Sequence, residues 1–188
     1  MASMTLMVLG LVLFMGIHLV PTSPTLRARL AARLGEGPYR GLFAIVSAAG
    51  LVLIVIGWPG TPERVSLFAP IPAARAASPL IVSIAFVLFA AANMQTHIRA
   101  RLRHPMLIGL LLWSGVHLLA NGDLAGTTLF GSFAVYSIVA IASAESRHAI
   151  KPVMPVWMHD AIALVAGLLG AYLVMRFHAQ LFGTGAVL

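Results

Sequence analysis

Two histidines lie within apolar stretches of this sequence, and imidazole is a side chain that can bind a metal or accept a proton near neutral pH. His18 ends the apolar run that begins at Met4, and His117 lies inside the run that begins at Pro105. Ionisable groups are costly in a membrane helix and usually face a bundle interior or a functional site. A neutral histidine that only hydrogen-bonds a neighbouring carbonyl is equally common, so a structural and a functional role both stay open.

Six apolar segments must position these histidines, and each approaches the roughly 20 residues that cross a bilayer as a helix. No alternation typical of strands competes, and lipid excludes open sheet edges. We therefore expect an all-α, polytopic transmembrane bundle of about six membrane-spanning helices, forming a single domain over residues 1–188. The expected spans are Met4–Val20, Tyr39–Trp58, Pro79–Met94, Pro105–Ala120, Leu124–Ala142 and Trp157–Phe177.

Composition supports a membrane protein. Of the 188 residues, 60% are hydrophobic and 9% are charged, whereas a soluble domain carries roughly a quarter charged residues. The lipid bilayer is therefore the expected partner. The net charge of +7 could suggest nucleic acid, but the arginines lie in short gaps between apolar segments, as membrane topology explains. The chain has no cysteine, which excludes disulfides and thiolate-bound metals.

The basic residues predict an orientation. Most of the Lys and Arg residues fall in the first, third and fifth connecting segments, which places those segments in the cytoplasm and both termini outside. The first of these segments, residues 25–34, spaces Leu between Arg and should form a short helix on lipid headgroups. The basic residues in the three segments are Arg27, Arg29, Arg33, Arg40, Arg99, Arg101, Arg103, Arg147 and Lys151.

Small residues predict where helices approach closely. Ala163, Gly167 and Ala171 are spaced by four on the last expected helix, and Gly50 and Gly57 lie on the second. Such positions let neighbouring backbones pack together in membranes. We give them a packing role only.

The surroundings of the two histidines favour haem over other metals. An imidazole projects from each of two expected helices among large apolar side chains, and His117 shares a helical stripe with Leu110, Trp113, Ser114 and Asn121. Haem b is held by axial histidines within an apolar enclosure. Zinc needs three or four ligands, and the interior offers two histidines and no carboxylate. We therefore predict haem b with His18 and His117 as metal ligands.

The tag Arg103-His104-Pro105 precedes the His117 helix. Its simplest role is to anchor a helix end at the cytoplasmic boundary, with the proline in the first turn, where its missing N–H costs little. If haem is present, Arg103 or His104 could instead face a propionate, because cationic donors suit carboxylates.

The sequence resembles the NnrU family of bacterial membrane proteins, which includes the domain of plant zeta-carotene isomerase. The resemblance runs nearly end to end and rests on the order and spacing of short tags. They are Gly16-Ile17-His18, Leu26-Arg27, Arg33-Leu34-Gly35-Glu36, Tyr39-Arg40-Gly41-Leu42-Phe43, Arg103-His104-Pro105 with Gly109, Trp113 and His117, and Asn121-Gly122-Asp123.

This resemblance implies a function. The isomerase is a haem b protein whose iron redox state controls cis-to-trans isomerisation of one double bond of a carotene precursor. Its axial histidines correspond to His18 and His117. Ser114 stands where the isomerase has a cysteine proposed as an alternative ligand, so ligand exchange through a thiolate is not expected here. The implied location is the bacterial inner membrane, with periplasmic termini and a hydrophobic small molecule as substrate.

Two alternatives remain. The bacterial members are associated with nitrite and nitric oxide reduction, so the chain could be a non-enzymatic accessory protein of denitrification with a membrane reductase as partner. The Arg103-His104-Pro105 tag also resembles an element of membrane isoprenylcysteine-type methyltransferases, which use S-adenosylmethionine. Those enzymes carry a Glu-Glu-rich helix where this chain has only Ala144-Glu145-Ser146-Arg147-His148, which makes this reading the weaker one.

Overall fold

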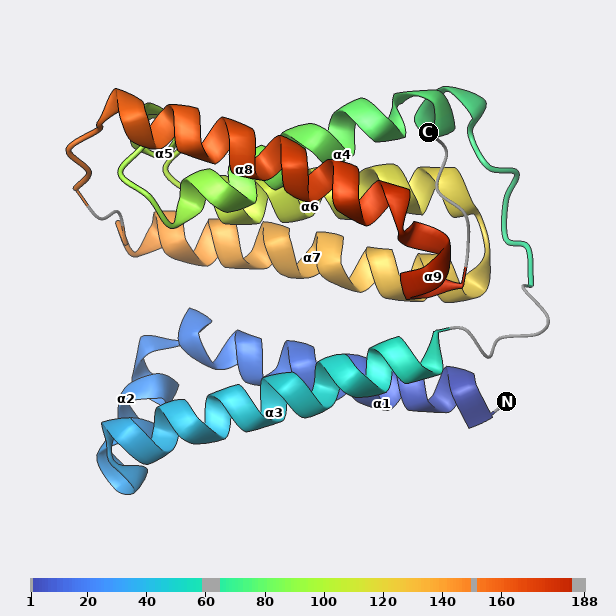
Figure 1. The fold of residues 1–188 in the computed structure, drawn as a ribbon. Coiled ribbons are helices and arrows are strands. Elements are labelled where there is room, and N and C mark those ends of the chain that lie inside the picture. The colour runs from blue at the N-terminus through green and yellow to red at the C-terminus, as the bar shows by residue number, and fades with distance from the viewer. Residues whose placement is uncertain (1, 59–64, 150–151, 184–188) are drawn as a thin grey trace. The chain divides into compact units, whose positions relative to one another are not determined.

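The computed structural model describes residues 2–58, 65–149 and 152–183, and these residues are helical apart from short connections (Figure 1). Five of the described helices are long and apolar enough to cross a membrane, and α6 is a shorter apolar helix. The helices are α1 (Ala2–Leu19), α2 (Pro24–Leu34), α3 (Glu36–Gly57), α4 (Pro72–Ala92), α5 (His97–Leu102), α6 (Pro105–Asn121), α7 (Leu124–Ser146), α8 (Trp157–Arg176) and α9 (His178–Phe182).

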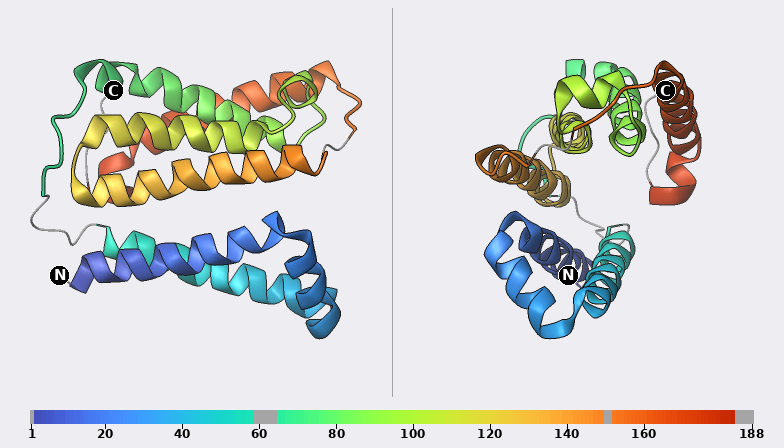
Figure 2. Two further views of the ribbon diagram at one scale, coloured as in Figure 1. Left: turned by 180° about the vertical axis from the view of Figure 1, so that it is seen from behind. Right: turned by 90° about the vertical axis from the view of Figure 1, so that its left-hand side faces the viewer.

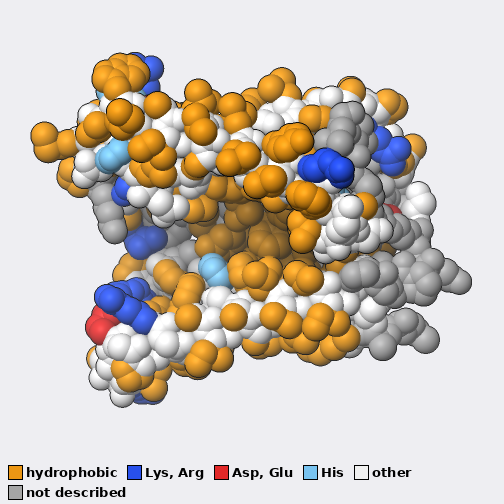
Figure 3. Space-filling model, in the orientation of Figure 1, with side chains coloured by type: hydrophobic (Ala, Val, Ile, Leu, Met, Phe, Trp, Pro, Cys, Tyr) orange, Lys and Arg blue, Asp and Glu red, His pale blue; other side chains and the backbone are white. Residues whose placement is uncertain are grey.

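This architecture confirms the all-α fold and gives each expected span a helical counterpart. Hydrophobic side chains cover much of the visible surface of both parts of the chain, and the Lys and Arg side chains in view lie near helix ends (Figure 3). Helices with apolar outer surfaces are the expected arrangement in lipid. The protein is therefore an integral membrane protein.

The chain divides into two compact units, residues 1–65 and 66–188. In the first unit α1 and α3 form an antiparallel hairpin, and α2 runs across the end where they connect (Figure 2). Gly10 and Gly50 lie where α1 and α3 cross, and a Cβ at Gly10 would lie 2.6 Å from the Gly50 carbonyl oxygen. This contact confirms the packing role predicted for Gly50 and shows that Gly10 shares it.

In the second unit, four apolar helices pack side by side in the spatial order α8, α4, α6, α7. Because α8 follows α7 in the chain, the chain must return across the unit to pack α8 against α4. Ala163, Gly167 and Ala171 are buried along α8, and Gly167 meets the backbone of Val87 on α4. The predicted close approach through these small residues is confirmed.

Helix α4 begins at Pro72, seven residues before the expected start at Pro79. A proline inside a helix lacks the N–H that would bond the carbonyl four residues earlier. Here the Ser78 hydroxyl donates a hydrogen bond to that carbonyl, on Arg75, at 2.8 Å. The hydroxyl replaces the missing donor, so the helix continues through Pro79.

The turn between α6 and α7 is tied to residues 66–71. Gly122 has φ +73°, and its carbonyl accepts hydrogen bonds from the N–H groups of Leu67 (2.8 Å) and Phe68 (3.1 Å). The Asp123 carboxylate caps α7 by accepting the Gly126 N–H at 2.6 Å. These bonds give Asn121-Gly122-Asp123 the role of a tight turn, as expected, and hold the segment before α4 against it.

The single domain expected over residues 1–188 stays a prediction.

Candidate functional site

His18 lies in the last turn of α1, half-buried within the first unit. Its Nδ1 is 2.7 Å from the carbonyl oxygen of Phe14, one turn earlier. The Phe14 ring stacks on the imidazole at a centroid distance of 4.1 Å. The Phe43 ring of α3 meets the imidazole edge-on at 5.0 Å. One hydrogen bond and two aromatic rings therefore set the orientation of this side chain.

His117 lies in α6 of the second unit and is oriented in the same way. Its Nδ1 is 2.8 Å from the carbonyl oxygen of Trp113, again one turn earlier. The Phe130 ring of α7 lies at 4.8 Å from the imidazole centroid, and Trp113 at 5.1 Å. Trp113 also contacts Phe130 and Phe133 at 5.2 and 5.5 Å. Four rings thus form an aromatic cluster between α6 and α7.

The carbonyl partners determine the tautomer of both neutral imidazoles. A carbonyl oxygen only accepts, so Nδ1 of His18 and of His117 carries the proton and donates it. The lone pair then lies on Nε2 in each ring. Histidines that bind metals usually donate the other ring N–H to a carbonyl or carboxylate in this way, which fixes their orientation and raises their basicity.

A short sequence repeat explains why the surroundings of His18 and His117 are alike. Phe14-Met15-Gly16-Ile17-His18-Leu19 matches Trp113-Ser114-Gly115-Val116-His117-Leu118 in the order aromatic, variable, glycine, β-branched, histidine, leucine. The aromatic residue supplies the carbonyl in both copies, and a phenylalanine of the next long helix in the chain flanks the ring in both. Sequence reasoning selected both histidines but missed this repeat, which aligning the two segments would have revealed.

Ser114 and Asn121 share α6 with His117, but their polar groups bond their own helix. The Ser114 hydroxyl is buried and lies 2.7 Å from the Leu110 carbonyl oxygen, to which it donates. The Asn121 side-chain amide donates to the His117 carbonyl oxygen at 2.6 Å. Their predicted cofactor contact stays a prediction, whereas Trp113 lies beside the His117 ring as the helical stripe predicted.

Arg103 and His104 lie at the other end of α6, about 20 Å from His117 by helical rise. Both contact Glu145 of α7, His104 through Nε2 at 3.0 Å and Arg103 through a guanidinium nitrogen at 3.4 Å. Arg103 has φ +60°, a backbone conformation that is uncommon for residues other than glycine. The pairing supports an anchoring role that joins the ends of α6 and α7. A contact with a haem propionate stays a prediction.

The structure thus gathers Trp113, Ser114, His117 and Asn121 on one helix and places His18 in the other unit. Among the described residues, no group of three or more His, Cys, Asp or Glu side chains could hold a metal ion. The donors that the chain offers a metal here are two separate imidazoles, each set in an aromatic, apolar neighbourhood. That donor set fits the axial ligands of a haem, which supplies its own four equatorial nitrogens.

Comparison with known proteins agrees with this architecture. The sequence matches the family described as NnrU protein over residues 6–186. The chain belongs to the NnrU family. No curated protein and no solved structure matches it. Family membership is therefore established by nearly the whole length of the chain, and it includes both copies of the histidine repeat.

Proposed function

We propose that this NnrU-family protein binds one haem b, with His18 and His117 as axial ligands. The observation that carries the proposal is the repeated arrangement of the two imidazoles. Each donates Nδ1–H to the carbonyl of an aromatic residue four positions earlier and is flanked by a phenylalanine ring. A structural histidine needs only one satisfied hydrogen bond, so a repeated orientation is better explained by a shared ligand.

The chain's own residues would hold the group in distinct ways. His18 and His117 would supply Nε2 lone pairs, while Phe14, Phe43, Trp113 and the α7 phenylalanines would provide apolar contact and exclude water. When bound, haem b would supply an iron centre that changes redox state. The apolar surroundings suit a hydrophobic small molecule as substrate, and we propose redox-dependent cis–trans isomerisation of a polyene as the activity.

A non-enzymatic accessory role, with a membrane reductase of nitrite or nitric oxide reduction as partner, is the second candidate. The observation that favours it concerns Ser114, where the resembling isomerase has a cysteine. The Ser114 hydroxyl donates to the Leu110 carbonyl and is fully buried, so it offers the iron no exchangeable thiolate. A haem with two permanent histidine ligands suits electron transfer as well as isomerisation.

Absorbance spectra of the purified protein, oxidised and dithionite-reduced, test the haem proposal. In wild type we expect a Soret band and, on reduction, resolved α and β bands. In His18→Ala and His117→Ala we expect loss of haem or a high-spin spectrum. His148→Ala is the matched control, because this exposed histidine lies outside both repeats. A wild-type preparation made with ample haem but lacking a Soret band would refute haem binding, and unaltered spectra in both variants would refute the ligands.

A second measurement separates the two candidate functions. The haem-loaded protein is incubated with a cis-polyene, oxidised or reduced, and the isomers are resolved by chromatography. Conversion in one redox state only, and loss of conversion in the His117→Ala variant, would support the isomerase. Intact haem spectra with no conversion in either state would favour the accessory role.

A further inference from the structure

A histidine–aspartate pair joins the start of α5 to the start of α8, outside both histidine repeats. The His97 Nδ1 is 2.7 Å from an Asp160 carboxylate oxygen. The same carboxylate accepts the backbone N–H of His97 at 2.9 Å and of Ile98 at 3.4 Å. The side chains of His97 and Asp160 are 27% and 17% exposed, so the pair is largely shielded but open on one side.

The hydrogen bond between the imidazole and the carboxylate is not needed to cap the nearby helix. The short helix α5 is already capped by the Thr96 hydroxyl, which accepts the Arg99 N–H at 3.0 Å, and Asp160 accepts the two preceding N–H groups. None of these bonds uses the imidazole. Because the His97 Nδ1–H donates to the Asp160 carboxylate, the lone pair of the neutral ring lies on Nε2. That nitrogen can accept a hydrogen bond from a ligand.

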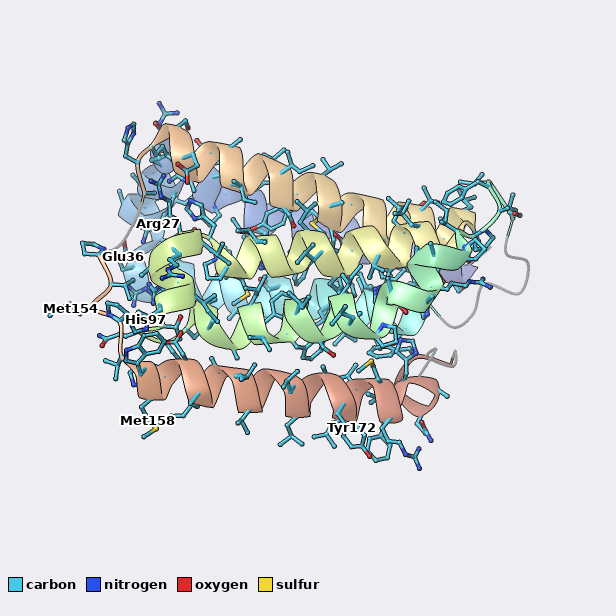
Figure 4. The ribbon with its side chains drawn as sticks, turned by 90° about the horizontal axis from the view of Figure 1, so that it is seen from above. Arg27, Glu36, His97, Met154, Met158 and Tyr172 are labelled. Carbon is cyan, nitrogen blue, oxygen red and sulfur yellow. The ribbon has the colours of Figure 1, made fainter. Side chains whose placement is uncertain are left out.

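Aromatic and apolar side chains border the pair. The Trp157 indole stacks on the His97 ring at 3.9 Å with an interplanar angle of 25°, and it is 76% exposed. Met154 and Met158 lie at the same end of α8, and Met158 points away from the helix bundle (Figure 4). Leu164 and Leu168 follow Asp160 at intervals of four residues and are exposed. An apolar stripe therefore runs from the pair along a helix of membrane-spanning length.

The charge of the pair restricts which headgroups can bind to it. With a neutral imidazole the pair carries one negative charge, which disfavours phosphate headgroups. The nearest cation in sequence, Arg99, contacts the Met94 carbonyl oxygen at 3.5 Å.

We propose that His97 and Asp160 form a binding site for the headgroup of a quinol, with the hydroxyl donating to the His97 Nε2. The aromatic ring of the headgroup lies beside the Trp157 indole, and the apolar tail follows Leu164 and Leu168 along α8. The ligand reaches the site by lateral diffusion in the bilayer. This site is independent of haem, since it uses neither His18 nor His117.

Ligand-induced thermal stabilisation tests the site in the full-length, detergent-solubilised protein. A ligand that binds only the folded state raises the unfolding midpoint in a concentration-dependent way. We expect decylubiquinol, kept reduced under anaerobic conditions, to raise the midpoint of wild type. Its dimethyl ether has the same ring and tail but no hydroxyl, and we expect no rise with it. Decanol, which has a hydroxyl but no ring, should not raise the midpoint either.

Two variants locate the binding. His97→Phe keeps a ring for Trp157 to stack on and keeps the backbone N–H bonds to Asp160, but it removes the proton acceptor. We expect the apparent Kd to weaken about tenfold or more, as loss of a hydrogen bond to a polarised acceptor implies. Asp160→Asn should weaken it as well, and His148→Phe, at an exposed loop position, should leave it unchanged.

The result that would overturn the proposal is equal stabilisation by the quinol and its dimethyl ether, or a wild-type affinity retained in His97→Phe. No stabilisation of the folded wild type at any quinol concentration would overturn it too. A far-UV circular dichroism spectrum like that of wild type shows that each variant is folded. The Soret band of the same preparations reports haem, so failure of this site and failure of haem binding are read separately.

Discussion

The crossing of α1 and α3 makes a measurable prediction for Gly10→Ala. The new Cβ would lie 2.6 Å from the Gly50 carbonyl oxygen, 2.7 Å from the Ile54 nitrogen and 2.9 Å from the Leu53 Cβ. Ordinary contact begins at 3.4 Å, and two of these three atoms belong to backbone that no rotamer change can move. The helices must separate by roughly 0.8 Å at the crossing to restore that distance, and overpacking of this kind costs about 1–3 kcal/mol.

Replacing glycine by alanine within a helix also returns about 1 kcal/mol of helix propensity. The net expectation for Gly10→Ala is a loss of about 0–2 kcal/mol in the free energy of unfolding of the first unit, which makes it about 1–3 kcal/mol less stable than a variant that gains the propensity without the clash. Gly16→Ala is the matched control on the same helix, because a Cβ there meets nothing within 4 Å. It should leave the unit unchanged or stabilise it by up to about 1 kcal/mol.

Sodium dodecyl sulfate titrated into dodecylmaltoside micelles provides the unfolding curve. With Trp113 and Trp157 replaced by Phe, Trp58 is the remaining tryptophan and reports on the first unit. Equal unfolding free energies for Gly10→Ala and Gly16→Ala would refute the close backbone contact. The Soret band of Gly10→Ala and Gly16→Ala with all three tryptophans kept extends the test, because the crossing also fixes Phe14, whose carbonyl orients His18.

Two further predictions concern the turn after α6. Gly122→Ala places a side chain at φ +73° against the Phe68 carbonyl, so we expect the same titration to show at least about 2 kcal/mol of destabilisation of the second unit. Gly131→Ala is the control, because a Cβ there meets nothing within 4 Å, and it should have little effect. Similar stabilities of the two variants would contradict this prediction. Asn121→Ala removes the hydrogen bond to the His117 carbonyl, so we expect the free energy of unfolding to fall by about 1 kcal/mol while the haem content per chain stays constant. Loss of haem without loss of stability would instead make Asn121 a cofactor contact.

Much of the fold was readable from apolar segment lengths and small residues. Those signals are local, and lipid leaves few alternatives to helices. The start of α4 was placed wrongly because Pro79 looked like a helix boundary. The compensating Ser78 hydroxyl depends on local geometry rather than on composition. Residues 25–34, expected as a short helix, form α2.

Some residues of the candidate sites could also be predicted from the sequence, and others could not. His18 and His117 stand out in sequence because each interrupts an apolar run, and their repeat was available to direct comparison. The His97–Asp160 pair was not predictable, since its partners are far apart in sequence and meet only because α8 returns to pack on α4. The bonds of Arg103 and His104 to Glu145 have the same origin, because they need α6 and α7 to lie side by side.

The division into two units has a consequence for the timing of assembly. The α1–α3 hairpin is complete by residue 65, whereas the proposed second ligand lies in α6. Ribosomes add about 5–20 residues per second, so roughly 5–20 s separate the synthesis of the two histidines. The hairpin itself is complete only after residue 65, which leaves 52 residues (66–117), or roughly 3–10 s, before His117 is made. In the proposed coordination, haem loading is therefore a late event that awaits insertion of the second unit.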